Sequence, residues 1–390
     1  MKLCVFTSTR ADYGIYLPLL RELKRNDKIE LRLFVTGTHL DETHGYTYAE
    51  IEKTGFQAHY KVSLDMNEQN DSHMPTFAKA VQQFSEALRT DLPDAAVVLG
   101  DRYETLAFAI VANSFGVPLC HLHGGEVTEG ALDDGYRHCI TKLSNFHFTV
   151  SEKCKARVIA MGENPSRVFN FGSLAMDNVK SLALLDSEAL VNEFGDVLKK
   201  SYVLVTYHPE TMSPGVDRVQ LPALLQNLEK LIAAKDLGVV MTRSNADQGN
   251  SWIHEQMQKF AEKYPKHVLY VASVGNIKFL SLLRNAEVLA GNSSSGIFEA
   301  PALGTPTLNI GDRQKGRERA ASVIDIDLNK ERMLEAVNLG FERALQMKGE
   351  IKDRNLSIFG DGRAAEQMVK VMNSTNFSRY MKKDFYEKLA

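Results

Sequence analysis

Five side chains that can act as acids or bases lie close together in the first half of the chain. They are Asp101, His123, Glu126, Asp133 and Asp134. Asp101 follows the apolar run 95–99 and His123 follows the apolar run 117–122, so both lie just beyond segments typical of buried strands. Ligands bind at the carboxyl ends of the strands in open parallel sheets. Carboxylates beside histidines at that edge predict an acid/base site that works near neutral pH.

Each of these carboxylates also has a simpler explanation at the start of a helix. Asp101 precedes a helical pattern in which Glu104 occupies the position that completes a capping box. Asp133 and Asp134 would lie in the first turn of a helix over residues 135–144, where acidic side chains complement the helix dipole. Three such positions on neighbouring loops favour one shared site over three independent caps.

A second polar segment predicts an anion site in the second half of the chain. Residues 291–296 read Gly-Asn-Ser-Ser-Ser-Gly between a strand pattern and a helix start. Backbone N–H groups, the hydroxyls of Ser293, Ser294 and Ser295 and the helix dipole would suit a phosphate. An ordinary serine cap with turn glycines is the alternative, although three consecutive hydroxyls exceed what a cap needs. The segment matches neither a Walker A loop nor a dinucleotide fingerprint.

Three more polar residues follow predicted strand ends, and each has an alternative explanation. Arg313 lies in the loop 311–317, whose arginines could neutralise a diphosphate or could form a solvated charged loop. Arg10 suits an anionic ligand, and a local ion pair with Asp12 explains it almost as well. His208 follows a strand pattern, where a histidine can act as an acid, a base or a phosphate donor, whereas lone histidines are more often structural.

The composition is that of a soluble globular protein and argues against several classes. With 46 Lys and Arg against 49 Asp and Glu, the net charge of −3 suggests neither a nucleic-acid groove nor an anionic membrane surface. No apolar run approaches the length of a membrane span. The four cysteines lack Cys-x-x-Cys spacing and no spacing resembles a metal site, so we expect neither a metal nor another cofactor. Without a leader-type segment, a cytoplasmic protein is expected.

Short β-branched runs alternate with helical patterns along the chain, which is typical of α/β folds with parallel sheets covered on both faces. The predicted strands cover residues 3–7, 31–35, 95–99, 117–122 and 147–150 in one series, and 202–205, 237–242, 268–271, 286–290 and 306–310 in a second. At 390 residues, two doubly wound domains that face a central cleft are the natural prediction. We place a Rossmann-like domain at 1–172, a second at 173–360 and a helical segment at 361–390.

Five motifs, in order, resemble one family of sugar-nucleotide enzymes. They are Thr-Arg-Ala-Asp-Tyr-Gly at 9–14, Gly-Asp-Arg-Tyr-Glu at 100–104, His-Gly-Gly-Glu-Val-Thr-Glu-Gly-Ala-Leu-Asp-Asp at 123–134, Tyr-His-Pro-Glu-Thr at 207–211 and Gly-Asn-Ser-Ser-Ser-Gly at 291–296. Together they closely resemble the hydrolysing UDP-N-acetylglucosamine 2-epimerases of the bacterial sialic and legionaminic acid pathways. The resemblance implies a GT-B fold with a UDP-sugar in the cleft and a final helix that crosses back to the first domain. It also implies a homodimer or homotetramer that serves capsule polysaccharide synthesis.

The reaction of this family, which the resemblance implies, requires acid/base groups and an anion site. The C2 proton of the sugar is not acidic, so its removal is coupled to loss of UDP from C1 by anti elimination, which gives a 2-acetamidoglucal. Water then adds with inverted configuration at C2 and releases N-acetylmannosamine and UDP. Such a reaction needs a base, a second acid/base group and stabilisation of charge on the diphosphate, without a metal or redox cofactor.

The resemblance also assigns roles residue by residue. The family's catalytic positions match Asp101, Glu126, Asp133 or Asp134, and His208. The substrate and UDP are expected to be bound by Arg10, Arg102, His123, Asn245, Ser273, Asn292, Ser293, Ser294, Ser295, Glu299 and Arg313. Some relatives carry Glu at the position of His123, and the loop before Asp133 is one residue longer than in some relatives. The division of roles between His123 and Glu126, and between Asp133 and Asp134, therefore stays open.

Three other activities share part of this pattern. A GT-B glycosyltransferase would share the fold and the anion site but needs a single base. A non-hydrolysing epimerase would return UDP-N-acetylmannosamine. The amino-acid sequences of residues 133–138 and 207–209 favour the hydrolysing branch over this one. A nucleotide-sugar sensor would not need the acids. Within the hydrolysing branch we expect UDP-N-acetylglucosamine as substrate, with UDP-N,N′-diacetylbacillosamine, which carries a 4-acetamido group and is 6-deoxy, as the alternative.

Overall fold

The computed structural model describes residues 1–42, 45–64, 73–129, 132–210, 213, 215–243, 250–271, 274–326, 332–351 and 357–387. Two of the residues expected to bind the substrate, Asn245 and Ser273, lie outside these ranges. Within them, none of the helices is long and apolar enough to cross a membrane.

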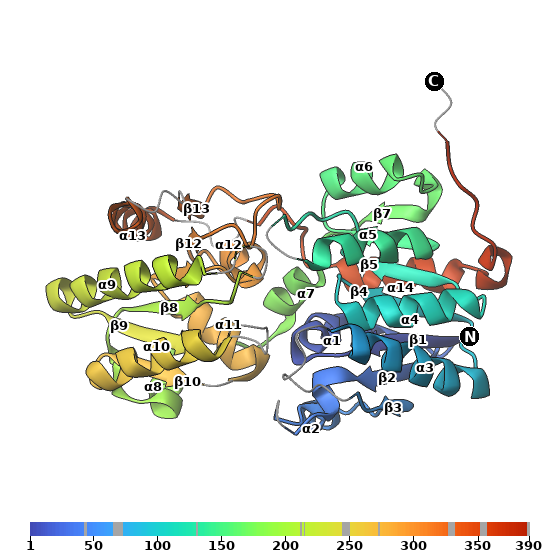
Figure 1. The fold of residues 1–390 in the computed structure, drawn as a ribbon, viewed down its shortest axis with the longest axis horizontal. Helices are drawn as coiled ribbons and strands as arrows, with labels where there is room; N and C mark the ends of the chain where they lie inside the picture. The colour runs from blue at the N-terminus through green and yellow to red at the C-terminus, as the bar shows by residue number, and fades with distance from the viewer. Residues whose placement is uncertain are drawn as a thin grey trace. The chain divides into compact units, whose positions relative to one another are not determined.

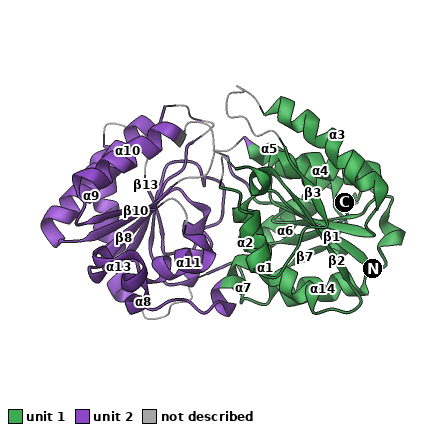
Figure 2. Cartoon of the chain, turned by 90° about the horizontal axis from the view of Figure 1, so that it is seen from below, with its two compact units in different colours: residues 1–126, 133–178, 359–390 green, residues 127–132, 179–358 purple. Residues whose placement is uncertain are grey.

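The chain forms two compact units (Figure 2). Unit 1 contains residues 1–126, 133–178 and 359–390, and unit 2 contains residues 127–132 and 179–358. Each unit has its own parallel sheet with helices on both faces (Figure 1), which confirms the predicted α/β class with two doubly wound domains. The chain passes between the units four times, after residues 126, 132, 178 and 358.

The sheet of unit 1 is entirely parallel and has the order β3-β2-β1-β4-β5-β6-β7. Its strands are β1 (Lys2–Thr7), β2 (Glu30–Thr36), β3 (Tyr60–Val62), β4 (Ala95–Leu99), β5 (Leu119–Leu122), β6 (Phe146–Thr149) and β7 (Val168–Asn170). Its helices and helical turns are α1 (Arg10–Lys24), η1 (Gly37–Leu40), α2 (Tyr48–Lys53), α3 (Met74–Thr90), α4 (Tyr103–Ser114), α5 (Asp133–Leu143), α6 (Glu152–Ala160), η2 (Pro165–Arg167), α7 (Leu174–Ser181), α14 (Ala364–Ser374) and η5 (Phe377–Tyr380). The strand order reverses between β1 and β4, so ligands are expected beyond the carboxyl ends of these strands.

The sheet of unit 2 is also parallel and has the order β10-β9-β8-β11-β12-β13. Its strands are β8 (Tyr202–Thr206), β9 (Gly238–Thr242), β10 (Val268–Val271), β11 (Val288–Gly291), β12 (Thr307–Ile310) and β13 (Val323–Ile326). Its helices and helical turns are α8 (Ser187–Phe194), η3 (Asp196–Lys199), α9 (Asp217–Lys235), α10 (Asn250–Lys263), α11 (Gly275–Asn285), η4 (Ser294–Gly296), α12 (Glu299–Ala302) and α13 (Met333–Glu350).

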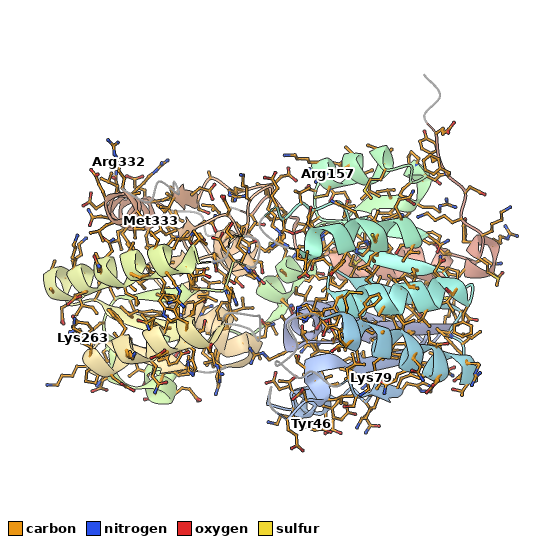
Figure 3. All side chains as sticks on the ribbon, viewed as in Figure 1. Tyr46, Lys79, Arg157, Lys263, Arg332 and Met333 are labelled. Atoms are coloured by element: carbon orange, nitrogen blue, oxygen red, sulfur yellow. The ribbon has the colours of Figure 1, made fainter. Side chains whose placement is uncertain are left out.

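Successive residues of β1 show how both faces of a sheet are covered. Leu3 and Val5 belong to one buried cluster, together with apolar residues of α1 and α14. Cys4 and Phe6 belong to another, together with residues of α3 and α4. A strand that is buried on both faces needs apolar residues at every position, which explains why β1 reads as a continuous apolar run. Long charged side chains point outward instead, as Lys79 and Lys263 do (Figure 3).

Three strands were not anticipated from the sequence, namely β3, β7 and β13. Each lies at an edge of its sheet, and each contains half-buried or exposed residues. An edge strand of three or four residues needs no continuous apolar run, so the pattern that identifies central strands is missing there.

The end of the chain completes unit 1, where the red α14 lies among the blue and green elements of Figure 1. The carboxylate of Asp177 in α7 accepts hydrogen bonds from the backbone N–H groups of Ala364 and Ala365, at 3.1 and 2.9 Å. Further along, Nζ of Lys383 lies 2.7 Å from the buried Glu163, which also pairs with His147 at 3.0 Å. Burial lowers the pKa of Lys383 to about 8.

Candidate active site

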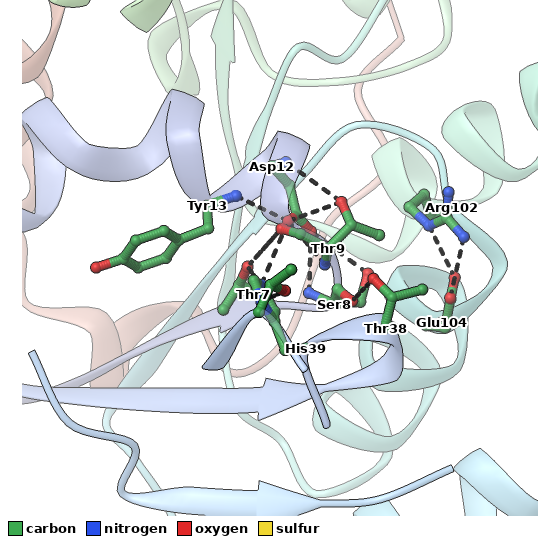
Figure 4. Close-up of polar contacts among 10 residues, drawn as sticks. Thr7, Ser8, Thr9, Asp12, Tyr13, Thr38, His39, Arg102 and Glu104 are labelled. Atoms are coloured by element: carbon green, nitrogen blue, oxygen red, sulfur yellow. Dashed lines mark hydrogen bonds and ion pairs between the residues drawn. The ribbon is translucent and has the colours of Figure 1, made fainter. Parts of the chain in front are cut away.

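The turn after β1 is organised around the carboxylate of Asp12 (Figure 4). Its oxygens accept hydrogen bonds from the N–H groups of Ser8 and Thr9, at 3.0 and 2.9 Å, and from the hydroxyl of Thr7 at 2.9 Å. Thr9 and Asp12 also form the capping box of α1. Among the described residues no ion pair joins Asp12 to Arg10, so the alternative explanation of Arg10 is wrong. The half-buried Arg10 lies just beyond the carboxyl end of β1, the edge at which open parallel sheets bind ligands.

Asp101, just beyond β4, pairs with an arginine of α5 and does not cap a helix. The N-cap of α4 is Arg102, and it makes no side-chain cap hydrogen bond, so the capping-box explanation of Asp101 is wrong. The carboxylate of Asp101 instead forms an ion pair with Arg137. Arg102 donates two hydrogen bonds of 3.2 Å to the fully buried Glu104 (Figure 4).

Arg137 joins two of the candidate acids and was not anticipated from the sequence. Its side chain is 1% exposed, and it pairs both with Asp101 and, at 3.1 Å, with Asp134. A buried guanidinium is tolerated only where carboxylates compensate its charge. One cation thus fixes two carboxylates that come from different loops. Arg137 lies one helical turn after Asp134, and this spacing is the signal that could have identified it.

Asp133 and Asp134 open α5, as the cap explanation expects, but their surroundings differ. Asp134 also faces Nε2 of His138 at 3.5 Å. Asp133 lies near Tyr103, whose phenol pKa is raised mainly by burial and in addition by nearby carboxylates, Asp133 among them. Of these two aspartates, Asp134 is linked to Asp101, because Arg137 pairs with both.

The loop after β5 carries a hydrogen-bonded dyad of His123 and Glu126. Nδ1 of His123 lies 2.7 Å from Oε1 of Glu126, and both side chains are almost fully buried. Nε2 of His123 lies 3.3 Å from Oγ of Ser173, a residue that no motif indicated. His123 and Glu126, whose division of roles the sequence left open, therefore form one hydrogen-bonded pair.

The backbone of this loop is strained at His123, whose φ of +63° lies in the left-handed region. Contacts on several sides hold the strained conformation. The N–H of His123 donates to the carbonyl of Phe148 at 3.0 Å. Gly125 packs so closely that a Cβ would lie 2.4 Å from the carbonyl oxygen of Cys154, and Arg157 (Figure 3) donates to the carbonyl of Gly125. Strain that the surroundings enforce is characteristic of functional loops.

His121, on β5, links this loop to the Asp101 loop. Its Nε2 lies 2.8 Å from the carbonyl oxygen of Gly100, and its Nδ1 lies 3.1 Å from Oγ1 of Thr141. Complete burial lowers the pKa of His121 to about 3. The ring is therefore neutral at physiological pH and serves to hold the ends of β4 and β5 together.

In unit 2, His208 is held by the side chain of Asn292. The amide of Asn292 accepts from the N–H of His208 at 2.7 Å and donates to its carbonyl at 2.8 Å. Both residues are buried. The side chain of Asn292 thereby joins the loops after β8 and β11, and its expected contact with UDP stays a prediction.

The serine loop differs from the expected strand, turn and helix. After β11 the chain forms only the short turn η4 and the four-residue helix α12, which begins at the half-buried Glu299. The expected contribution of a helix dipole is therefore wrong, since so short a helix has little macrodipole. Ser293 caps η4 by accepting from the N–H of Ser295 at 3.3 Å, as the cap explanation expects. The hydroxyls of Ser294 and Ser295 make no hydrogen bond within the described part of the chain, which leaves them as donors for an anion.

The loop after β12 approaches the serine loop. Nη1 of Arg313 and Nε2 of Gln314 lie 3.5 and 2.9 Å from the carbonyl oxygen of Asn292. On its other side, the carbonyl of Lys315 accepts a hydrogen bond of 3.0 Å from the N–H of Glu129, which also belongs to unit 2. Arg313 is thereby held at Asn292, the residue that precedes the three serines. Across the described ranges, no group of three or more His, Cys, Asp or Glu side chains is arranged to hold a metal ion.

Known proteins are similar to this chain over most of its length. The family model described as UDP-N-acetylglucosamine 2-epimerase matches residues 21–373. A Campylobacter jejuni protein named GDP/UDP-N,N′-diacetylbacillosamine 2-epimerase (hydrolyzing) is 38% identical over 329 residues, which cover 84% of this chain and 85% of the relative. A Legionella pneumophila protein named UDP-N,N′-diacetylbacillosamine 2-epimerase (hydrolyzing) is 33% identical over 374 residues, 96% of each chain.

The fold is also that of a solved structure. The UDP-GlcNAc 2-epimerase from Neisseria meningitidis bound to UDP-GlcNAc aligns with a TM-score of 0.78, covering 96% of this chain and all of that chain at 18% identity. At this identity the likeness establishes the fold alone, which is GT-B-like.

Proposed function

Because this chain belongs to the UDP-N-acetylglucosamine 2-epimerase family, we propose that it is a hydrolysing 2-epimerase of that family. The observation that carries the proposal is the arrangement of acids in unit 1. Arg137 holds Asp101 and Asp134, while His123 separately holds Glu126. Removal of the C2 proton and its return on the opposite face need two proton-handling groups, and these two groups supply them.

The proposed reaction begins with elimination. One of the two acid groups takes the C2 proton as the bond between C1 and the UDP oxygen breaks, which gives UDP and a 2-acetamidoglucal. We propose that Arg313 and the hydroxyls of Ser294 and Ser295 bind the diphosphate, and that His208 donates to it. Positive charge and fixed donors stabilise the negative charge that develops on the leaving group.

The second step is hydration of the glucal. The oxygen of a water molecule bonds to C1 and its surplus proton is released to solvent, while the second acid group delivers a proton to C2 from the face opposite to the first abstraction. The two acid groups then regain their starting charges by proton exchange with water. The product is N-acetylmannosamine, and UDP leaves unchanged. A glycosyltransferase would need one base only, so the presence of two separately held groups favours the epimerase.

UDP-N-acetylglucosamine is the proposed substrate, and UDP-N,N′-diacetylbacillosamine is the second candidate. The description of the family model supports the first. The names of the relatives at 38% and 33% identity support the second. The cytoplasmic location and the homodimer or homotetramer stay predictions.

One incubation experiment tests this function. The protein is given each UDP-sugar in deuterated water, and the products are identified by NMR. Free UDP together with a manno sugar that carries deuterium at C2 is the expected result, and the sugar that reacts identifies the substrate. An intact UDP-sugar epimer would contradict hydrolysis, and no turnover of either sugar would overturn the proposal.

A further inference from the structure

We propose that Ser173 is a positioning residue that sets the tautomer of His123 and thereby keeps Glu126 oriented as a proton acceptor. The inference rests on the proposed function, because it names a residue that serves the acid/base dyad of that reaction. Ser173 directly precedes α7, is fully buried and belongs to none of the five sequence motifs.

The backbone and the hydroxyl of Ser173 are both held by hydrogen bonds, and the hydroxyl lies against His123. Its N–H donates to the carbonyl of Phe359 at 2.8 Å, which fixes the backbone. Its Oγ accepts from the N–H of Ala175 at 3.2 Å and lies 3.3 Å from Nε2 of His123. A hydroxyl has one proton to donate and two lone pairs. The bond from Ala175 uses one lone pair and leaves the proton of Ser173 free, and Nε2 of His123 is the side-chain partner that lies within reach of that proton.

These contacts together select one tautomer of the ring. A carboxylate can only accept, so the 2.7 Å contact with Glu126 favours the tautomer with the proton on Nδ1 of His123. A neutral imidazole has a single N–H, so Nε2 must then accept, and Ser173 is the donor that faces it. Several other ionisable groups lie on the elements around this loop, among them His147 on β6, which pairs with Glu163. His121 is neutral because burial lowers its pKa to about 3, and Arg157 is engaged with the carbonyl of Gly125.

The selected tautomer matters each time Glu126 changes its charge. Glu126 accepts or returns one proton during the reaction, while His123 and Ser173 neither gain nor lose one. When the carboxylate is charged, the N–H on Nδ1 stabilises it. In the other tautomer a lone pair of the ring would face the carboxylate and would repel it, which would displace Glu126 from the substrate.

The tautomer can be measured on the full chain without any substrate. Nitrogen NMR of isotope-labelled histidine distinguishes protonated from unprotonated ring nitrogens, and the His123→Asn variant identifies the signals of His123 among the 11 histidines. We expect the proton on Nδ1 in the unaltered protein and a shift toward Nε2 in Ser173→Ala. A proton on Nε2 in the unaltered protein, or the same tautomer in both proteins, would overturn the inference.

The kinetic test is a double-mutant cycle. We expect Ser173→Ala to lower kcat by about 10- to 100-fold with a much smaller change in KM. Ser173→Thr, which keeps the hydroxyl, should retain most of the kcat of the unaltered protein. In a His123→Asn background the side-chain amide can still donate to Glu126, but no imidazole Nε2 remains to accept from Ser173. In that background Ser173→Ala should therefore lower kcat by less than about 2-fold. Additive losses would contradict the proposal. If Ser173→Ala fails to fold, Ser173→Cys, which keeps the volume with a weaker donor, should show an intermediate loss.

A matched control separates this role from the loss of any buried hydroxyl. Ser144 is fully buried in the same unit and donates to the carbonyl of Ile140 at 2.8 Å. Ser144→Ala should leave both the tautomer of His123 and kcat unchanged. If the unaltered protein turns over neither UDP-sugar, the proposed function fails, and the NMR result still decides the tautomer on its own.

Discussion

Arg137 is a charged side chain that the fold buries almost completely, and such burial is costly unless opposite charges compensate it. Asp101 and Asp134 provide that compensation from two different loops. The arginine therefore determines where these carboxylates lie, because moving either one would leave a buried charge with incomplete compensation. Arg137, which the sequence analysis did not identify, thus fixes the positions of Asp101 and Asp134, which it did identify.

Asp101→Asn tests the role of this carboxylate at the residue scale. The variant keeps an oxygen that can accept from Arg137 and removes the negative charge. We expect kcat for UDP release to fall by about 10²- to 10⁴-fold with the fold retained. Asp361→Asn is the control, since Asp361 also pairs with an arginine but is 53% exposed, and it should keep full activity. A nearly normal rate for Asp101→Asn would contradict the proposed site.

The buried His121 predicts a loss of stability in acid. Its pKa falls from 6.5 to about 3 on folding, so between these values the unfolded chain binds a proton that the folded chain does not. The free energy of unfolding should therefore decrease as the pH falls below about 6.5, by about 1.4 kcal/mol per pH unit for this group. His147, whose pKa burial also lowers, acts in the same direction.

Urea unfolding followed by circular dichroism at several pH values measures this effect. His121→Gln should be less stable overall, and its pH dependence below about 6.5 should be shallower by about one proton. An unchanged slope would contradict the assignment to His121.

The types of the candidate acids could be predicted from the sequence, but their partners could not. Asp101 and His123 each follow an apolar run, and the carboxyl ends of neighbouring parallel strands share one edge of the sheet. The pairing of Arg137 with Asp101 joins residues from separate loops, and its geometry depends on how α5 packs. Ser173 contacts His123 only because α7 begins beside β5 in space, and no spacing in the sequence encodes that contact.

At the scale of elements, the central strands were predictable because burial on both faces demands continuous apolar runs. The edge strands β3, β7 and β13 lacked that signal. The helix expected after the serine loop was wrong for a different reason. Residues after Ser293 carry a helical pattern, but the chain there forms only η4 and α12 before it enters β12. The local pattern shows which residues can form a helix, but not how many of them do so.

Gly291→Ala tests the loop between β11 and η4. Gly291 has φ of +136°, and an added Cβ would lie 2.1 Å from the carbonyl oxygen of Thr206. The loop would have to move, and we expect UDP to bind at least about 10-fold more weakly in a calorimetric titration. Gly349→Ala in α13 is the control, because nothing lies within 4 Å of its added Cβ. It should leave UDP affinity unchanged and stabilise the helix by about 0.5–1 kcal/mol, and equal effects of both changes would contradict the argument.

At the scale of the whole molecule, unit 1 depends on residues far apart in the sequence. Met372 of α14 is completely buried in the unit 1 core, whereas Met381 is 61% exposed. Met372→Ala should lower the free energy of unfolding by about 2–5 kcal/mol, and Met381→Ala by less than about 0.5 kcal/mol. Urea unfolding of the two variants checks this difference. Similar losses would mean that α14 contributes little to the core.

The path of the chain also sets the order in which a newly made molecule can be completed. Residues 179–358, which form nearly all of unit 2, leave the ribosome before α14 is synthesised. Domains generally fold as units during synthesis, so unit 2 can finish first. Until residues 364–374 emerge, the sheet of unit 1 lacks the helix that covers part of its apolar face. Each nascent chain therefore passes through a stage with exposed core residues, and chaperones that bind apolar surface would act on this protein at that stage.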